Sequence, residues 1–184
     1  MPSFIKPAED GARRGTETHK LMENLPFDDL DALRQSKDLL NKHIEEEHRK
    51  GRLKNPELIN LKEVVSFISS ALAKRMEEAK KEGKLYREQP FFFAVPATEF
   101  DSDFPEEEDI LVQGVIDAFF EEDGALVLVD YKTDRLKSAD DFIKLYAKQL
   151  EIYARALEQI RGLKVKEKLI YSFCLGSTIE IPSE

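Results

Sequence analysis

Two aspartates and a lysine, Asp117, Asp130 and Lys132, have side chains and a spacing that suit chemistry on a phosphate ester. They flank an Asp123-Gly124 dipeptide between two apolar runs, and this dipeptide is preferred in two-residue type I′ β-hairpin turns. Counting outward from the turn places Asp117 opposite Asp130, with Cβ atoms about 4.5–5.5 Å apart. Lys132 projects from the same strand face as Asp130, because side chains alternate along a strand. The turn therefore predicts that two carboxylates and one ammonium converge.

Two opposed carboxylates in an apolar sheet repel each other, so a compensating positive charge is expected beside them. A hard divalent cation with oxygen ligands is the usual one, and Mg²⁺ is the natural choice. Such a cation activates water and neutralises charge on a phosphoryl group, while a neighbouring ammonium stabilises the transition state. The predicted chemistry is phosphodiester hydrolysis. The alternative is structural, with Asp130 and Lys132 as an ion pair at a strand end and Asp117 at a sheet edge.

The elements that would hold these residues are predicted from periodicity and capping signals. Apolar runs bounded by turn signals indicate strands at 86–95, 111–120, 125–131, 168–175 and 178–181. The first three runs are apolar at both alternating sets of positions, which favours central strands. Ser138 opens a helix that runs to about Arg161 and stops at Gly162. This order of elements predicts an α/β fold with a mixed central sheet flanked by helices.

The N-terminal part of the chain is predicted to be helical. Thr16 is a candidate N-cap residue for a short amphipathic helix, with His19 in its first turn. Residues 28–82 are rich in Leu, Lys and Glu, which indicates at least two amphipathic helices. We expect one domain over 1–184, with a mainly helical segment at 1–83 and an α/β core at 84–184.

Composition excludes several classes of protein. The 184 residues, 41% of them hydrophobic, are enough for one sizeable core. No apolar run approaches the roughly 20 residues of a membrane span, and no signal-peptide pattern begins the chain, so we expect a soluble, cytoplasmic protein. Cys174 is the only cysteine, which excludes a disulfide or an iron–sulfur cluster assembled within the chain.

Charge is unevenly distributed along the chain. The formal net charge of −9 argues against a protein that coats nucleic acid. Residues 99–123 include eleven acids and no Lys or Arg, whereas residues 131–168 include ten Lys and Arg against six acids. The second segment could meet a phosphate backbone, although solvated charge on an exposed helix explains the same pattern.

Four motifs extend the group around the hairpin. They are RGTETH at 14–19, REQPF at 87–91, GVID at 114–117 and VDYKTD at 129–134, followed by Gln149 and Tyr153. Together they resemble the motifs of RecB-type nucleases in the PD-(D/E)XK superfamily, and above all the C-terminal nuclease domains of AddA subunits of bacterial helicase–nucleases. The resemblance covers nearly the whole chain and implies a restriction-endonuclease-like core.

The resemblance implies a metal site. It implies that His19, Asp117, Asp130 and the Tyr131 carbonyl hold the ion. The ion would be Mg²⁺, with Mn²⁺ able to replace it. The sibling AddB-type nucleases have four cysteines around an iron–sulfur cluster, so the single cysteine here favours the AddA type and no cluster.

The resemblance also implies catalytic roles. Lys132 would be the catalytic lysine beside Asp117 and Asp130, and Gln149 and Tyr153 would support the site and the DNA strand. The residues alone agree on Gln149, because it shares a helical stripe with Phe142, Tyr146, Tyr153 and Ala156, and an amide among apolar residues needs a polar partner. Glu88 is left as a structural or a site residue.

The implied function is that of a Mg²⁺-dependent DNA nuclease, acting in double-strand-break processing and recombinational repair. Its substrate would be DNA, delivered as single strands by a helicase. Its partners would be N-terminal helicase domains of the same polypeptide and a second, AddB-type protein. No association with a membrane is expected. No G-x-x-x-x-G-K-[ST] loop occurs, so the ATP motor would precede this segment. Two alternatives stay open: a stand-alone nuclease of restriction or CRISPR type, and a catalytically silent module that binds DNA or a partner.

Overall fold

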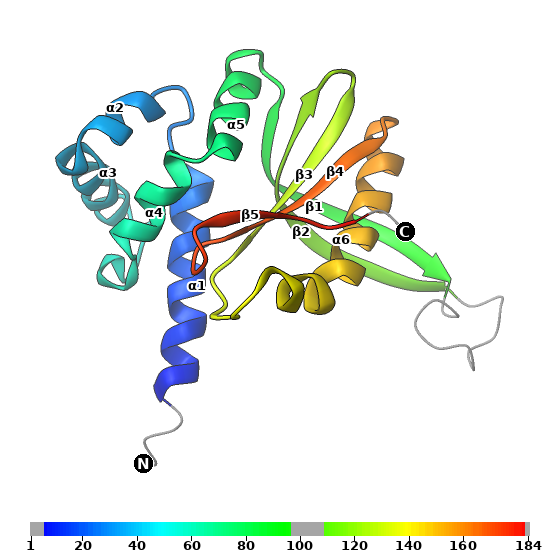
Figure 1. The fold of residues 1–184 in the computed structure, drawn as a ribbon, viewed down its shortest axis with the longest axis horizontal. Coiled ribbons are helices and arrows are strands. Elements are labelled where there is room, and N and C mark those ends of the chain that lie inside the picture. Colours follow the sequence, from blue (N-terminus) through cyan, green and yellow to red (C-terminus); the bar gives the residue numbers. More distant parts are fainter. Residues whose placement is uncertain (1–5, 97–108, 183–184) are drawn as a thin grey trace.

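A five-stranded sheet lies at the centre of the fold, with helices on both of its faces (Figure 1). The computed structural model describes residues 6–96 and 109–182. Its helices are α1 (Lys6–Asn24), α2 (Leu30–Gln35), α3 (Lys37–Arg49), the 3-10 turn η1 (Pro56–Leu58), α4 (Leu61–Ile68), α5 (Ala71–Lys81) and α6 (Ala139–Arg161). Its strands are β1 (Leu85–Pro96), β2 (Asp109–Glu122), β3 (Ala125–Lys132), β4 (Val165–Ser172) and β5 (Ser177–Glu180). Over these described stretches, no helix is long and apolar enough to cross a membrane.

The sheet is mixed and has the order β1-β2-β3-β4-β5. All neighbouring strands are antiparallel except β3 and β4, which are parallel. Helix α6 joins these two, because parallel neighbours need a long crossover. The Ser138 side chain accepts the Asp141 N–H at the start of α6, and Gly162 follows its end with a φ of 69°. The predicted mixed α/β fold and the predicted helix are confirmed.

The turn between β2 and β3 has the predicted backbone conformation. Asp123 and Gly124 have φ values of 54° and 76°, and a type I′ turn needs positive φ at both central positions. Strand pairing then follows the predicted register from the turn as far as Ala118 and Val129. Asp117 and Asp130 are the next residues on their strands, just beyond the last pair of this ladder.

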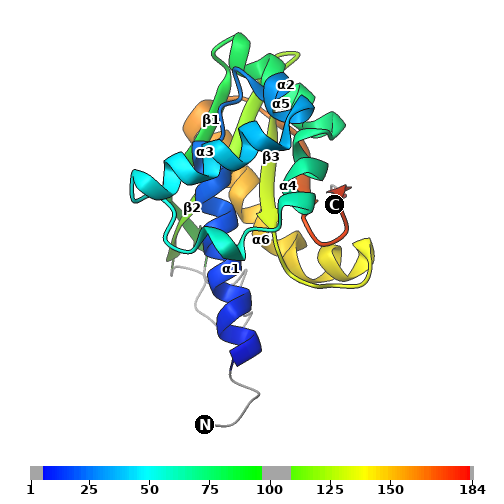
Figure 2. The ribbon, with the colours of Figure 1, turned by 90° about the vertical axis from the view of Figure 1, so that its left-hand side faces the viewer.

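A hydrophobic cluster covers each face of the sheet. On one face, the helices α1 to α5 lie against the sheet (Figure 2). In the cluster between them, the ring centroid of Phe67 lies 4.8 Å from that of Tyr171 and 5.4 Å from that of Tyr131. On the other face, Leu150 and Leu157 of α6 belong to a second hydrophobic cluster. This cluster also contains sheet residues such as Ile116 of β2 and Leu128 of β3. Burial on both faces explains why the runs of β2 and β3 are almost wholly apolar.

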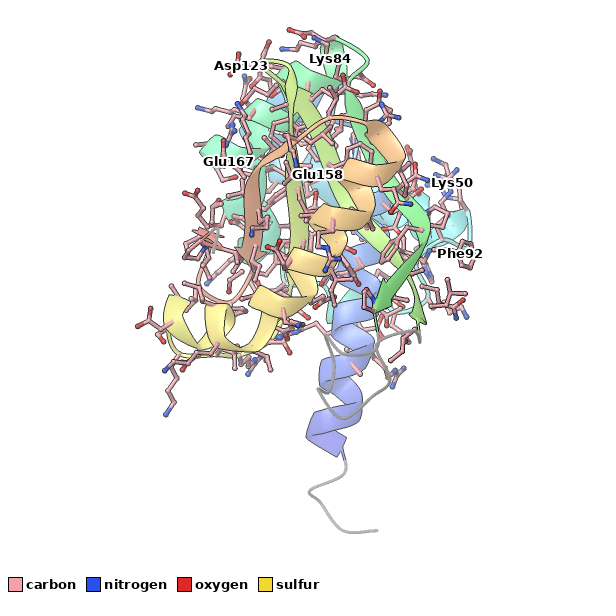
Figure 3. The ribbon with its side chains drawn as sticks, turned by 90° about the vertical axis from the view of Figure 1, so that its right-hand side faces the viewer. Lys50, Lys84, Phe92, Asp123, Glu158 and Glu167 are labelled. Carbon is pink, nitrogen blue, oxygen red and sulfur yellow. The ribbon has the colours of Figure 1, made fainter. Side chains whose placement is uncertain are left out.

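Strand β1 differs from the prediction, because it is an edge strand and not a central one. At the far end of the β1–β2 ribbon, Phe92 is 69% exposed and Leu111 is 65% exposed. Phe92 lies on the outer side of β1, away from the body of the protein (Figure 3). An apolar run indicates a strand, but it does not tell whether another layer covers that strand.

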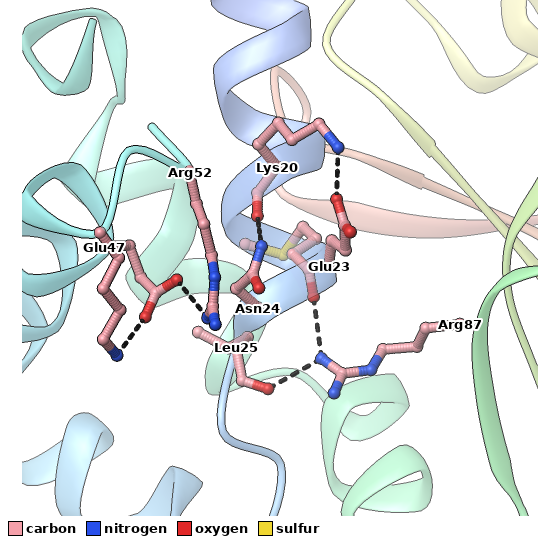
Figure 4. A network of polar contacts seen from close by, with 9 residues as sticks. Lys20, Glu23, Asn24, Leu25, Glu47, Arg52 and Arg87 are labelled. Carbon is pink, nitrogen blue, oxygen red and sulfur yellow. Dashed lines mark hydrogen bonds and ion pairs between the residues drawn. The ribbon is translucent and has the colours of Figure 1, made fainter. Parts of the chain in front are cut away.

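Helix α1 also differs from the prediction, because it begins at Lys6 and so includes Thr16 in its interior. The Thr16 hydroxyl donates to the Ala12 carbonyl at 3.1 Å and caps nothing. His19 consequently lies well inside a long helix instead of in the first turn of a short one. At the other end of α1, the Arg87 guanidinium donates to the carbonyls of Met22 and Leu25 at 3.2 and 2.8 Å (Figure 4).

Candidate active site

A cleft of about 300 Å³ lies where α1, the end of β3 and α6 meet. It is lined by Ala12, Gly15, Thr16 and His19 of α1, by residues 131–134, and by Tyr146 of α6. The end of β3 therefore presents the segment that follows Asp130 to an open space between two helices.

Asp130 and Lys132 form a buried ion pair at the end of β3. The Lys132 ammonium lies 2.7 Å from Oδ2 of Asp130, and only 5% of the Asp130 side chain is exposed. Burial is the largest influence on the pKa of Asp130 and raises it; the Lys132 ammonium lowers it, and the pKa remains above its ordinary value. The charge of this carboxylate is therefore only partly compensated.

Asp117 lies beside this pair on β2. Its Oδ2 accepts the backbone N–H of Tyr131 at 2.7 Å, so its side chain reaches across to the neighbouring strand. Burial is the largest of the effects that together raise the pKa of Asp117 to about 6, and the negative charge of Asp130 adds to it. The His19 ring and the Lys132 ammonium lower the pKa of Asp117.

His19 reaches the hairpin from α1. One ring nitrogen, Nε2, lies 2.8 Å from the Tyr131 carbonyl oxygen, and Nδ1 lies 3.7 Å from Oδ1 of Asp117. The approach is close because position 15 is a glycine, where an added Cβ would lie 3.0 Å from Oγ1 of Thr133. Arg14 also donates to the Thr133 carbonyl, at 2.5 Å. Helix α1 is therefore attached at two points, to the end of β3 through Tyr131 and to the residue that follows β3, Thr133.

Helix α6 brings an amide and a hydroxyl group to the same place. Oε1 of Gln149 accepts from the Lys132 ammonium at 3.4 Å, and its Nε2 donates to the Tyr153 hydroxyl at 2.9 Å. The Tyr153 ring packs edge-on against Phe91 of β1, with centroids 5.1 Å apart. Gly114 is needed beneath them, because a Cβ there would lie 2.9 Å from the Phe91 ring.

Glu88 of β1 lies close enough to affect the electrostatics of this group. Burial and the negative charge of Asp117 raise the pKa of Glu88, while Lys20 and His19 lower it. The backbone of Glu88 has a φ of 51°, which is unusual for a residue other than glycine. Residues in such strained conformations occur often at functional sites.

The side chains expected to hold a metal lie near one another but do not form a ready-made ligand cluster. Among residues 6–96 and 109–182, no group of three or more His, Cys, Asp or Glu side chains is placed as metal ligands. The available donors are the carboxylates of Asp117 and Asp130, the His19 ring and the Tyr131 carbonyl, a set rich in oxygen that suits Mg²⁺ or Mn²⁺. Asp117 and Asp130 both have raised pKa values, so their negative charges are not fully compensated by the protein. A bound cation would compensate the remaining charge and the repulsion between the two carboxylates. By donor chemistry and by charge, these residues fit a divalent cation.

Two contacts of the site were missed by reasoning from the sequence. Arg14 lies within the motif at 14–19, but its contact with Thr133 joins residues that are 119 positions apart. The Tyr146 ring lies 4.3 Å from the Lys132 ammonium, measured to the ring centroid. Its spacing of three residues from Gln149 on one helix face was the available signal for a contact with the same lysine.

The known proteins with similar sequences are nucleases or subunits of helicase/nucleases. The PD-(D/E)XK nuclease superfamily matches residues 3–178. An ATP-dependent helicase/nuclease subunit from Clostridium acetobutylicum is 36% identical over 98% of this chain, and its counterpart from Thermoanaerobacter sp. is 36% identical over 97%. The counterpart from Lachnoclostridium phytofermentans is 31% identical over all of it. The chain spans only 15–16% of the length of these curated relatives.

Proposed function

The chain belongs to the PD-(D/E)XK nuclease superfamily, and on that basis we propose that it hydrolyses the phosphodiester bonds of DNA with Mg²⁺ as its cofactor. The observation that supports this most directly is the hairpin end, where Asp117, Asp130 and Lys132 lie together beside an open cleft. Two buried, incompletely compensated carboxylates are unfavourable for stability, which is typical of residues kept for function.

Each site residue has a role that follows from its position. We propose that Asp117, Asp130, His19 and the Tyr131 carbonyl hold the cation, and that Mn²⁺ is able to replace Mg²⁺. A bound divalent cation would supply Lewis-acid stabilisation and a water of lowered pKa. Lys132, one of the residues that line the cleft, stabilises through its ammonium the negative charge that develops on the phosphoryl group.

Gln149 and Tyr153 act behind Lys132. The Gln149 amide accepts from the ammonium and donates to Tyr153, so the two residues orient the lysine from α6. We also infer that residues 1–184 work as one nuclease module. In support, the helices of 1–83 and the sheet share a single hydrophobic cluster, and His19 comes from the helical segment.

The wider role that we propose is that of the nuclease part of a larger helicase/nuclease polypeptide of the AddA type. The relatives are named as subunits of ATP-dependent helicase/nucleases, and this chain corresponds to about 15% of their length. We infer that helicase domains deliver single strands of DNA to the cleft, that an AddB-type protein is the second partner, and that the complex processes double-strand breaks in the cytoplasm. The site needs no iron–sulfur cluster.

A plasmid-nicking assay tests the proposed activity. The chain is incubated with supercoiled plasmid in Mg²⁺, in Mn²⁺ and in EDTA, and Asp117→Asn and Lys132→Ala serve as controls. We expect nicked and linear products with either metal, no products in EDTA, and far slower formation of products with the variants. DNA binding without cleavage by wild type would instead favour a catalytically silent binding module.

A linear substrate distinguishes the forms of DNA that the site accepts. Labelled single strands and duplexes of the same sequence are compared in Mg²⁺, and cleavage of single strands is expected to be faster. Efficient cleavage of duplex within a short recognition sequence would favour a stand-alone nuclease of restriction type.

A further inference from the structure

The ring of Tyr146 faces the ammonium of Lys132. The nitrogen lies 4.3 Å from the ring centroid, within the range of a cation–π contact. Tyr146 also lines the cleft, and its side chain is half-buried. We propose that Tyr146 is a positioning residue that orients the Lys132 ammonium toward the cleft. This inference rests on the proposed nuclease function, in which Lys132 acts on the substrate.

A lysine at this position needs several contacts, because its four-carbon side chain is flexible. The strand supplies one contact, Asp130 at 2.7 Å. Helix α6 supplies two, the Gln149 oxygen at 3.4 Å and the Tyr146 ring. Without the ring, the long hydrogen bond to Gln149 is the contact among the described residues that would oppose the attraction of Asp130. The ammonium would then have more freedom to leave the orientation that catalysis needs.

The Tyr146 side chain is itself oriented by its surroundings. Its hydroxyl forms a hydrogen bond with Asp134, another residue that lines the cleft. Burial, followed by this contact, raises the pKa of Tyr146, so the ring stays neutral and its hydroxyl keeps its proton at physiological pH. The Phe142 ring lies on the preceding turn of α6, with centroids 6.2 Å apart. Tyr146 therefore acts on Lys132 through the face of its ring and not through its hydroxyl.

Substitutions at Tyr146 separate the ring from the hydroxyl. Tyr146→Met and Tyr146→Leu remove the aromatic face, whereas Tyr146→Phe keeps it. In the plasmid assay we expect the first two variants to lower kcat about tenfold with little change in KM, since a misplaced catalytic group affects the transition state more than binding. Tyr146→Phe is expected to restore most of the lost kcat.

The chain offers a matched control at the other end of α6. There the Arg161 guanidinium lies 4.2 Å from the centroid of the Tyr86 ring, which is the same kind of contact outside the cleft. Tyr86→Leu removes that contact and is expected to change the melting temperature but not kcat. Loss of kcat that merely follows loss of stability would appear in this control as well.

A second readout does not depend on nuclease activity. The Lys132 side chain is 13% exposed, so amine-reactive labelling of this lysine, followed by peptide mass spectrometry, reports on its orientation. Labelling of Lys132 is expected to rise in Tyr146→Met and to stay low in Tyr146→Phe, while labelling of the exposed Lys164 is the same in all. Wild-type kcat and labelling in both the Met and the Leu variant would overturn the inference, as would a Phe variant as impaired as these two. Absence of cleavage by wild type would contradict the nuclease function alone, and labelling would still decide whether the ring orients the lysine.

Discussion

The two aspartates of the site differ in what compensates their negative charge. Asp130 has the Lys132 ammonium at 2.7 Å. Asp117 has the backbone N–H of Tyr131 and, at 3.7 Å, the ring of His19. Because Asp117 is deeply buried, and no Lys or Arg of the described residues pairs with it as Lys132 pairs with Asp130, a neutral substitution there removes a costly charge and loses only the longer contact with His19. Asp117 is therefore the position at which the trade of stability for function should be measurable.

The first prediction is that Asp117→Asn stabilises the metal-free protein in a pH-dependent manner. The folded-state pKa of Asp117 is raised to about 6 from 3.8, so the folded state binds the proton more tightly than the unfolded state. Asp117 therefore lowers the stability of wild type as pH rises between these values, and this contribution is absent from Asp117→Asn. The difference should be near zero below pH 4 and grow to at most about 3 kcal/mol above pH 7. Urea unfolding in EDTA across this range measures it.

The isosteric amide keeps the acceptor for the Tyr131 N–H, so the comparison isolates the charge. Asp123→Asn, which makes the same change of side chain at an 85% exposed aspartate in the turn of this hairpin, is the control. A difference that is constant with pH, or a variant less stable than wild type at pH 7, would contradict the assigned burial cost.

The second prediction is that Lys132→Ala lowers the rate of DNA cleavage by about 10²- to 10³-fold while Mg²⁺ still binds. The ammonium is assigned to the transition state, and its removal leaves the metal-binding donors in place. Cleavage kinetics and calorimetric titration with Mg²⁺ check the two halves. Lys164→Ala, at an ammonium that is 88% exposed, is the control. Retention of wild-type kcat by Lys132→Ala would remove the lysine from the mechanism.

At the scale of elements, α1 decides where His19 lies. Its N-terminal half contacts Thr133 through Arg14, and its C-terminal carbonyls accept from Arg87 on β1. Between them, the buried carboxylate of Glu17 accepts the Lys54 N–H at 3.0 Å. Helix α1 is thus attached to β1 through Arg87, to the cleft residue Thr133 and to Lys54, which follows α3. A shift of the helix would displace His19 from the Tyr131 carbonyl.

The third prediction compares two glycines of α1. A Cβ at Gly11 would meet no atom within 4 Å in the part of the chain that the structure describes, so Gly11→Ala should stabilise the protein by about 0.5–1 kcal/mol through helix propensity. A Cβ at Gly15 would lie 3.0 Å from Oγ1 of Thr133, so Gly15→Ala should gain less stability or lose some. Because α1 carries His19, Gly15→Ala should also lower cleavage. Urea unfolding and the plasmid assay test both variants, and equal behaviour of the two would contradict the close approach of α1.

At the scale of the whole molecule, one arginine joins the helical segment to the sheet. Arg75 of α5 donates to both carboxylate oxygens of Glu122 on β2 and of Glu167 on β4, at 2.6–2.9 Å. Its guanidinium also lies 5.4 Å from the centroid of the Phe120 ring. Hydrogen bonding to Arg75 is the main reason why the pKa of Glu122 is lowered to about 2.

The fourth prediction is that Arg75→Met destabilises the protein by about 1–3 kcal/mol at neutral pH. Solvent screening holds the loss toward the lower end of this range, because the side chains of Glu122 and Glu167 are 30% and 26% exposed. The lowered pKa of Glu122 means that its contribution is present above its ordinary value of 4.5 and is lost as pH falls toward 2. The difference between wild type and variant should therefore shrink over that interval in urea unfolding. Arg75→Lys keeps the charge but not the forked geometry, and should restore only part of the stability.

The fifth prediction concerns metal binding by the folded protein. Mg²⁺ should raise the melting temperature of wild type. At a Mg²⁺ concentration one hundred times the Kd for Mg²⁺, the free energy of unfolding should rise by about 2.7 kcal/mol. Asp117→Asn should respond little, because it lacks one of the proposed ligands. Matched ionic strength with NaCl controls for general screening. An equal response of both proteins to Mg²⁺ would place the cation elsewhere.

Local signals in the sequence were enough for much of the fold. Asp123-Gly124 predicted a hairpin and its register. The turn has positive φ at both central positions, and the predicted register is observed as far as Ala118 and Val129. Ser138 and Gly162 likewise marked the ends of α6, since capping depends on atoms only a few residues apart. Placing Asp130 and Lys132 on one strand face needed no more than the alternation of side chains.

The tertiary structure alone decided which distant residues join this group. The contact of His19 with Tyr131 spans 112 positions, and only resemblance to a family had connected His19 with the hairpin. Two predictions from local patterns were wrong: α1 is longer than the short helix expected, and β1 is an edge strand instead of a central one. These features depend on which apolar surfaces pack together, and that free energy comes from burial between elements far apart in the chain. A local pattern shows that a residue is apolar or charged, but only packing determines which residue lies against it.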